Sequence, residues 1–200
     1  ESGLQGVVSH DSYLINLAAP DGELWTKSID SFIVELQRAE QLGIPYVVLH
    51  PGAYTTSSVE AGLKRVAAAL DEVHRQTRGI DAKCLLETTS GQGSCLGCRF
   101  EHLAEILGGV RDPERLGVCV DTCHIFSAGY PLGTEEEYAT TMGALGKIVG
   151  LKLVKAFHLN DSKARFGSGV DRHDHIGRGQ MGLEPFRLLL NDSRFRRVPM

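Results

Sequence analysis

Side chains that commonly bind metal ions are frequent in this chain. Eight of its 200 residues are histidines. Six of them lie in settings typical of metal ligands: His10, His50, His124, His158, His173 and His175. A neutral imidazole is a good zinc ligand, and carboxylates complete such sites. The residue types therefore point first to metal chemistry.

Five candidate ligands recur at nearly constant spacing. Each ends, or nearly ends, a short apolar run, and successive members are 40, 37, 34 and 37 residues apart: His10, His50, Glu87, Asp121 and His158. A single histidine at a strand end is more often a satisfied structural group than a ligand. Five such residues on one face would crowd like charges and desolvated polar groups unless bound cations compensate them. We therefore predict that the set binds metal.

Two local clusters extend the predicted site. The segment DTCH places Asp121 and His124 three residues apart, on the turn after a predicted strand. Alternate residues of an extended loop point the same way, so Asp171 and His173 of DRHDH can chelate one ion together. His175 would share that side, but a hydrogen-bonding loop histidine is the better interpretation of that residue alone.

The elements that would position these residues alternate along the chain. Short β-branched runs predict strands at 6–10, 46–50, 83–87, 117–121 and 153–159. Apolar residues at the helical period predict helices at 28–43, 58–79, 99–108, 134–149 and 183–190. This alternation is typical of βαβ units and a parallel sheet. The strand ends converge on one face of a closed barrel, whereas in an open sheet they lie along a line. A cluster of five ligands from five strand ends therefore favours an α/β fold of the TIM (β/α)8 barrel type.

The chain is short for a complete barrel of this kind, which typically needs about 250 residues. The sequence opens directly into a predicted strand and stops at RFRRVPM, where another strand would be due. We interpret residues 1–200 as a single, partial β/α-barrel domain that lacks N-terminal units and the last strand.

Composition excludes several classes of function. The chain is 42% hydrophobic and 23% charged, as in ordinary globular proteins, and has neither an apolar run that could cross a membrane nor the layout of a signal peptide. Five cysteines, including one CxxC at Cys95 and Cys98, suggest reduced thiols and a cytoplasmic protein without a membrane partner. The segment GQG lacks the Lys-Ser/Thr end of a P-loop, and no GxSxG elbow is present. The formal net charge of −4 means that DNA binding would need a local positive potential or metal ions.

Six segments closely resemble the endonuclease IV family of apurinic/apyrimidinic endonucleases. In order and with family-like spacing, they are HDSYLINLAAP (10–20), LHPGAY (49–54), LLETTSGQG (85–93), GVCVDTCHIFSAGY (117–130), FHLNDSK (157–163) and DRHDHIGRGQMG (171–182). The resemblance spans nearly the whole chain. It implies a TIM barrel with three zinc ions that cuts double-stranded DNA on the 5′ side of abasic sites in base excision repair.

The resemblance also implies a role for each ligand. His10 and His50 would bind one zinc, and Glu87, the expected catalytic carboxylate, would bridge it to a second zinc. Asp121 and His158 would bind that second ion. The third ion would be held by His124, Asp171 and His173. The last ligand of the family, a glutamate, would lie beyond Met200, and an arginine that contacts DNA would lie before Glu1.

Two further residues match family positions that probe DNA at the lesion. They are Tyr13 and Leu14, for which the sequence alone equally allows ordinary packing at a strand end. The expected protein is a monomer that hydrolyses phosphodiesters with zinc-activated water. One alternative is a sugar isomerase or epimerase on a related barrel, which would not need the third metal position. The other is a module that binds abasic DNA without cutting it.

Overall fold

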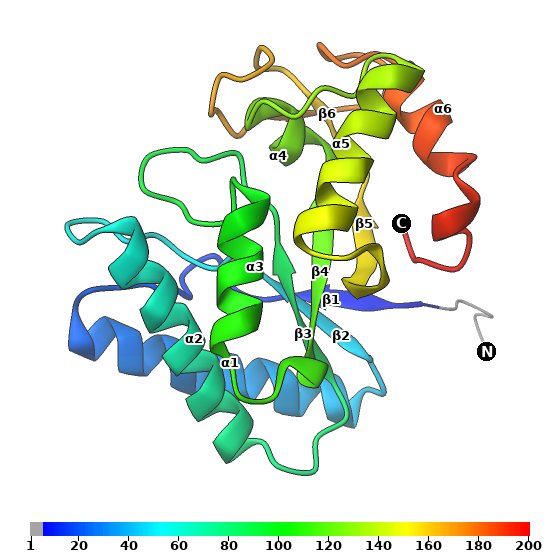
Figure 1. The fold of residues 1–200 in the computed structure, drawn as a ribbon. Helices are drawn as coiled ribbons and strands as arrows, with labels where there is room; N and C mark the ends of the chain where they lie inside the picture. The colour runs from blue at the N-terminus through cyan, green and yellow to red at the C-terminus, as the bar shows by residue number, and fades with distance from the viewer. Residues whose placement is uncertain (1–5) are drawn as a thin grey trace.

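Five parallel strands form the central sheet of the computed structural model, which describes residues 6–200. They pair in chain order: β1 (Val8–His10), β2 (Tyr46–Leu49), β3 (Lys83–Glu87), β4 (Leu116–Asp121) and β5 (Val154–His158). A doubly wound sheet reverses its strand order at a switch point, whereas a barrel keeps adding strands on one side. The predicted strands are therefore confirmed to within one or two residues, and their order is that of a β/α barrel (Figure 1).

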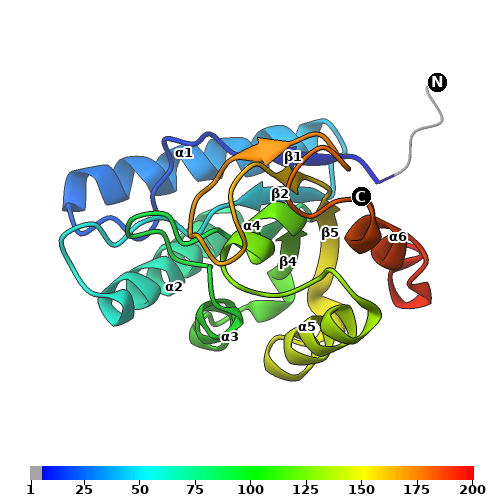
Figure 2. The same ribbon diagram turned by 90° about the horizontal axis from the view of Figure 1, so that it is seen from above.

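Helices follow the strands and cover the outer face of the sheet. Seen from above, four of them succeed one another around it: α1 (Gly22–Gln41), α2 (Val59–Gln76), α3 (Phe100–Gly109) and α5 (Glu135–Ile148) (Figure 2). Helix α6 (Glu184–Leu190) contacts α5, and three short 3-10 helices lie at Pro113–Arg115, Leu151–Leu153 and Ser193–Phe195. Within residues 6–200, no helix is both long and apolar enough to span a bilayer.

Side-chain caps fix where the long helices begin. The side chain of Asp21 accepts a hydrogen bond from the backbone of Leu24 at the start of α1, and Ser58 does the same for Ala61 at the start of α2. Helix α5 begins with a capping box between Thr134 and Glu137. Helix α1 starts at Gly22, six residues before the predicted helix. The prediction began at the first residues with periodic apolar spacing, whereas the cap, Asp21, comes earlier in the sequence.

Two elements above the strand ends escaped prediction. Helix α4 (Thr122–Ser127) takes the place of the predicted turn after β4, and Asp121 caps it. The segment expected to be an extended loop pairs in part, because β6 (Asp161–Ser162) and β7 (His173–Asp174) form a two-stranded antiparallel sheet. Both elements are too short to show a periodic pattern in the sequence.

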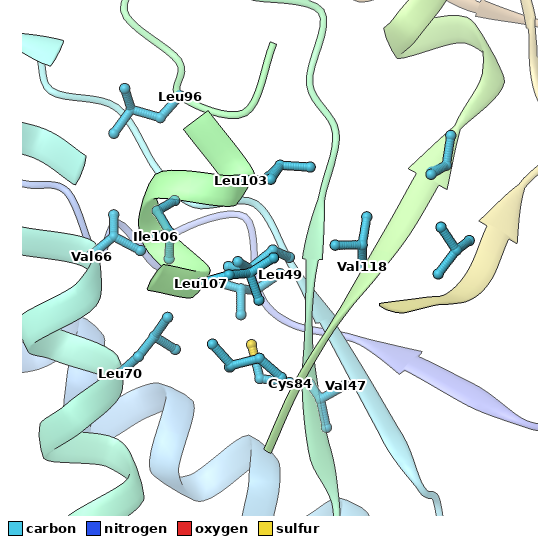
Figure 3. Close-up of a cluster of buried hydrophobic side chains, with 14 of the residues drawn as sticks. Val47, Leu49, Val66, Leu70, Cys84, Leu96, Leu103, Ile106, Leu107 and Val118 are labelled. Atoms are coloured by element: carbon cyan, nitrogen blue, oxygen red, sulfur yellow. The ribbon is translucent and has the colours of Figure 1, made fainter. Parts of the chain in front are cut away.

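The sheet has a separate apolar cluster on each face. On the outer face, strand side chains pack against α2 and α3 (Figure 3). The strands contribute Val47, Leu49, Cys84 and Val118, and the two helices contribute Val66, Leu70, Leu103 and Ile106. The alternate residues form a smaller cluster of Val48, Leu85, Cys119 and Ala156. Because side chains alternate between the faces of a strand, the residue two positions beyond each member of this smaller cluster points the same way. Those residues are His50, Glu87, Asp121 and His158.

Candidate metal centre

The predicted strand-end ligands meet at the carboxyl edge of the sheet. His10, Glu87, Asp121 and His158 are the last residues of their strands, and His50 directly follows β2. All five side chains point to the same face of the sheet as the inner cluster. For His10 this follows because Val8, two residues earlier, packs on that cluster. The fold thus brings five residues from five strands to one place.

The carboxylate of Glu87 lies at the middle of this group and is 1% exposed. Its Oε2 atom lies 2.9 Å from His10 Nε2 and 3.1 Å from His50 Nε2. Its Oε1 atom lies 2.7 Å from His158 Nδ1 and 3.5 Å from His124 Nδ1. Burial by itself raises the pKa of Glu87, but hydrogen bonds from these four histidines bring it well below the usual range. The two oxygens therefore face two different sets of imidazoles.

His10 is held from its other side by Asp11. The Nδ1 atom of His10 lies 3.0 Å from the backbone oxygen and 3.2 Å from the Oδ1 atom of Asp11, whose side chain is 4% exposed. Burial lowers the pKa of His10, but the hydrogen bonds with Asp11 and Glu87 and the charge of Glu87 outweigh it and raise the pKa to about 10. Sequence reasoning missed Asp11, although its place directly after a candidate ligand was a usable signal.

A second compact group joins α4 to the segment that contains β7. His124 is 2% exposed, its Nδ1 lies 2.7 Å from the backbone oxygen of Thr88, and its Nε2 lies 3.1 Å from Asp171 Oδ2. His173 Nε2 lies 3.3 Å from Asp171 Oδ1 and 3.3 Å from His124 Nε2. Hydrogen bonds to Asp171 and Glu87 raise the pKa of His124 to about 11, against the lowering effect of burial.

Asp121 lies between the two groups and is fully buried. Its Oδ1 accepts a hydrogen bond from the backbone of His124 (2.9 Å), and its Oδ2 accepts one from Asn160 Nδ2 (2.6 Å). The same Oδ2 is 3.9 Å from His158 Nδ1 and 3.8 Å from His173 Nε2. Asp121 therefore faces both neighbouring histidines, and Asn160 is a second contact that the sequence did not reveal.

Several sets of donor atoms lie close enough to share an ion, with all members within 4.8 Å of one another. Two of them coincide with predicted sets: His10, His50 and Glu87; and His124, Asp171 and His173. Around the predicted second position the structure groups other residues, namely Glu87 with Cys119 and His158, Asp121 with Cys123 and His173, and Glu87 with Asp121 and His124. Cys119 lies close to Glu87 and His158 because its side chain points to the inner face of β4. Cys123 lies close to Asp121 and His173 because it is in the first turn of α4.

The donor set fits divalent cations. In the described chain, the ion-pair partners of Glu87, Asp121 and Asp171 are all histidines, with neither lysine nor arginine among them. Imidazole nitrogens and carboxylate oxygens are zinc donors, and a bound cation replaces the protons that such imidazoles otherwise carry.

Three remaining candidates lie at the edge of the centre. Tyr13 and Leu14, on the turn after β1, are 92% and 68% exposed, so they do not pack against the strand end. His175 is exposed and belongs to none of the donor groups found within residues 6–200. This agrees with its interpretation as an ordinary loop histidine.

Comparisons with known proteins bear on the fold and the family of the chain. The family model described as a xylose isomerase-like TIM barrel matches residues 1–200, and the predicted fold type is confirmed. The chain is 56% identical over 199 residues to a probable endonuclease 4 of Chloroflexus aurantiacus, with 100% of the chain and 70% of the relative covered. The crystal structure of endonuclease IV from Thermus thermophilus superposes with a TM-score of 0.82 at 38% identity, over 96% of this chain and 66% of that one. A D-tagatose 3-epimerase-like protein superposes with a TM-score of 0.72 at 21% identity, a level that shows a shared fold alone, over 96% of this chain and 68% of that one.

Proposed function

Since the chain belongs to the endonuclease 4 family of xylose isomerase-like TIM barrels, we propose that it is a zinc-dependent apurinic/apyrimidinic endonuclease. Its reaction would be hydrolysis of the DNA phosphodiester bond on the 5′ side of an abasic site. We further propose that residues 1–200 form a single, partial β/α-barrel domain that acts as a monomer. All five cysteines are free thiols, as a cytoplasmic location would require.

The observation that carries the proposal is the division of the Glu87 carboxylate between two sets of histidines. One oxygen faces His10 and His50, and the other faces His158. This is the arrangement that a carboxylate bridging two cations needs. We assign a first zinc to His10, His50 and Glu87, a second to Glu87, Asp121 and His158, and a third to His124, Asp171 and His173. Bound zinc would supply a Lewis acid for the phosphate and acidify water at neutral pH.

The chain's own residues supply the placement of the donor atoms. Glu87 and Asp121 are buried at the end of a rigid sheet, so their oxygens keep a fixed separation. The Nδ1 contacts of His10 with Asp11 and of His124 with Thr88 fix those rings and leave both Nε2 atoms to face the centre. Such preorganisation is what the displacement at phosphorus requires from the protein.

DNA would be held by residues around the centre. Tyr13 and Leu14 project into solvent beside His10, where an aromatic ring and an aliphatic side chain can fill the gap left by a missing base. The segment that connects β5 to α6 exposes four cationic side chains near Asp171 and His173: Lys163, Arg165, Arg172 and Arg178. These side chains would contact the phosphates, since a chain of net charge −4 needs local cationic groups for DNA binding.

The sugar isomerase alternative is less well supported. Its relatives share the fold at 21% identity or thereabouts, whereas the chain is 56% identical to a probable endonuclease 4. The compact group of His124, Asp171 and His173 also goes beyond what a site with one or two ions needs.

A nicking assay tests the proposal. A duplex with a single abasic site and a matched intact duplex are incubated with zinc-loaded protein, and the new ends are mapped. We expect cleavage of the abasic duplex alone, leaving a 3′ hydroxyl, and loss of cleavage after chelation. Binding without cleavage would favour the DNA-binding module, and conversion of ketoses without DNA cleavage would favour the isomerase.

A further inference from the structure

In the described part of the chain, one buried carboxylate beside the centre hydrogen-bonds with backbone groups alone. Asp161, the first residue of β6, is fully buried. Its Oδ2 accepts hydrogen bonds from the backbone of Gly177 and of Gly179, both at 3.0 Å. Its Oδ1 accepts hydrogen bonds from the backbone of Met181 (3.0 Å) and of its neighbour Ser162 (2.7 Å).

This arrangement compensates a charge that would otherwise be costly to bury. A buried carboxylate destabilises a fold unless donors surround it, and hydrogen bonds to an ionised acceptor are stronger than neutral ones. Backbone N–H groups converging on an anion form such a compensating nest. Three of the four donors come from 177–181, so the path of that segment is fixed by a side chain sixteen or more residues away.

The close approach of Gly179 shows how tightly the segment is held. A Cβ atom at this position would clash with Asp161 Oδ1 and with the backbone oxygen of Ser162. Real side chains do not tolerate such an overlap, so position 179 accepts only glycine without a shift of the backbone.

The same short strand also holds the start of the segment, where two ligands lie. Residue Asp161 pairs with Asp174, and Ser162 pairs with His173. The backbone N–H of Lys163 donates to Arg172 O at 2.8 Å, and that of Gln180 donates to Ser162 O at 2.7 Å. Residues 161–163 are therefore the frame for 171–181, through backbone pairing at one end and the Asp161 carboxylate at the other.

The ligands of this segment have few contacts outside the frame, namely the hydrogen bond from the backbone of Asp171 to Gln92 Oε1 (2.9 Å) and the side-chain contacts with His124. The side chains of Asp171 and His173 are 37% and 43% exposed, and neither lies on the central sheet. By contrast, His10 and Glu87 end β1 and β3, and His50 directly follows β2. Within residues 6–200, none of their side-chain hydrogen bonds or ion pairs reaches residues 161–163. A change in the frame should therefore move one group of ligands and spare the other.

We propose that Asp161 is a positioning residue that sets the place of Asp171 and His173, and thereby the retention of the ion they share with His124. This inference rests on the proposed function, because it concerns one of the proposed zinc ions. Asp161 itself is not a ligand: both its oxygens are used by backbone donors, and it belongs to none of the donor groups in the described chain.

The test compares Asp161→Asn with Asp174→Asn. Both substitutions remove one negative charge from the same residue pair of β6 and β7. Within residues 6–200, however, the Asp174 carboxylate accepts a hydrogen bond from the backbone of His175 alone. An amide at position 161 would turn donor hydrogens toward backbone donors. We expect Asp161→Asn protein to lose about one zinc per chain on dialysis against a weak chelator and to keep the others. Amides of 175–181 should exchange with deuterium at least about tenfold faster than in the wild type. The Asp174→Asn protein should behave as the wild type in both measurements.

A second variant keeps the test decisive if Asp161→Asn does not fold. Gly179→Ala pushes the same segment from the opposite side, and we expect the same selective loss of one zinc. Wild-type zinc content and exchange in both variants would overturn the inference. Loss of all ions together, with a lower melting temperature and faster exchange throughout, would also overturn it, because Asp161 would then support the whole fold. A wild-type chain that holds no zinc would instead count against the proposed function.

Discussion

The Nδ1 atom of His10 lies 3.2 Å from the carboxylate of Asp11, while the opposite ring nitrogen, Nε2, lies 2.9 Å from Glu87. A carboxylate on the far side of a metal-binding imidazole fixes the tautomer and the ring orientation and makes the ring a better ligand. Asp11 thus completes the environment of the proposed first zinc without belonging to its donor group.

The first prediction follows from this pair. Asp11→Asn should weaken zinc binding at the His10, His50 and Glu87 position by about 10- to 100-fold, the usual effect of losing such a contact. Competition with a coloured zinc chelator measures the change. Asp30→Asn, at an exposed position of α1, is the control for loss of one charge. Unchanged affinity in the Asp11→Asn protein would show that the side chain has only a structural role.

The second prediction concerns Glu87. Glu87→Gln keeps the shape of the side chain but removes the charge that faces four histidines. We expect abasic-site cleavage to fall by about a thousandfold or more, because two-metal catalysis depends on the ions being held together. Affinity for abasic DNA, measured by fluorescence anisotropy, should change little, since the proposed outer contacts remain. Glu72, a partly exposed residue of α2, supplies the control, Glu72→Gln. Near-normal turnover of the Glu87→Gln protein would refute the bridging role.

The third prediction concerns the exposed pair beside His10. Tyr13→Ala and Leu14→Ala should leave the melting temperature unchanged, because both side chains are mostly in solvent. Each should weaken binding to abasic DNA more than to intact duplex, by about 1–3 kcal/mol for the aromatic ring. Leu42→Ala is a matched control, since Leu42 is 74% exposed at the end of α1. Equal losses on both duplexes would mean that the pair does not sense the lesion.

The positions of the proposed strand-end ligands could be predicted because one rule accounts for all of them. Each of His50, Glu87, Asp121 and His158 stands two residues after a buried strand residue of the inner cluster, so the alternation of side chains carries the ligands to the same face. The repeated spacing of one β/α unit then brings them to the same edge. Strand limits and ligand positions could therefore be inferred from periodicity alone.

The contacts that orient those ligands could not be inferred in this way, because they join residues far apart in sequence. Thr88 meets His124, Asn160 meets Asp121, and Gln92 accepts a hydrogen bond from the backbone of Asp171 at 2.9 Å. Such pairs depend on how α4 and the β6–β7 sheet pack against the ends of the strands. Elements this short have no period from which their position could be inferred.

The last prediction concerns the pH dependence of stability, away from the proposed metal centre. His74 lies in α2 with 4% exposure, and its Nδ1 is a buried atom without a hydrogen-bond partner in the described chain. Burial, together with the nearby positive charge of Arg115, lowers the pKa of His74 from 6.5 to about 4. Arg115 is held in place by donating to the backbone oxygen of His74 at 3.0 Å.

The sign of the effect follows from the two protonation states. Between pH 6.5 and about 4, an unfolded chain protonates this histidine while the folded chain keeps it neutral. Because the unfolded state then binds more protons, the free energy of unfolding falls as the pH falls through this window and is unaffected by this group above it. His74→Leu removes the titration, so its free energy of unfolding should depend on pH less steeply, by up to one proton, between pH 6.5 and 4. Urea unfolding of metal-free wild-type and His74→Leu protein at several pH values measures the difference in slope. The wild-type slope in the His74→Leu protein would mean that His74 is protonated in the folded state as readily as in the unfolded one.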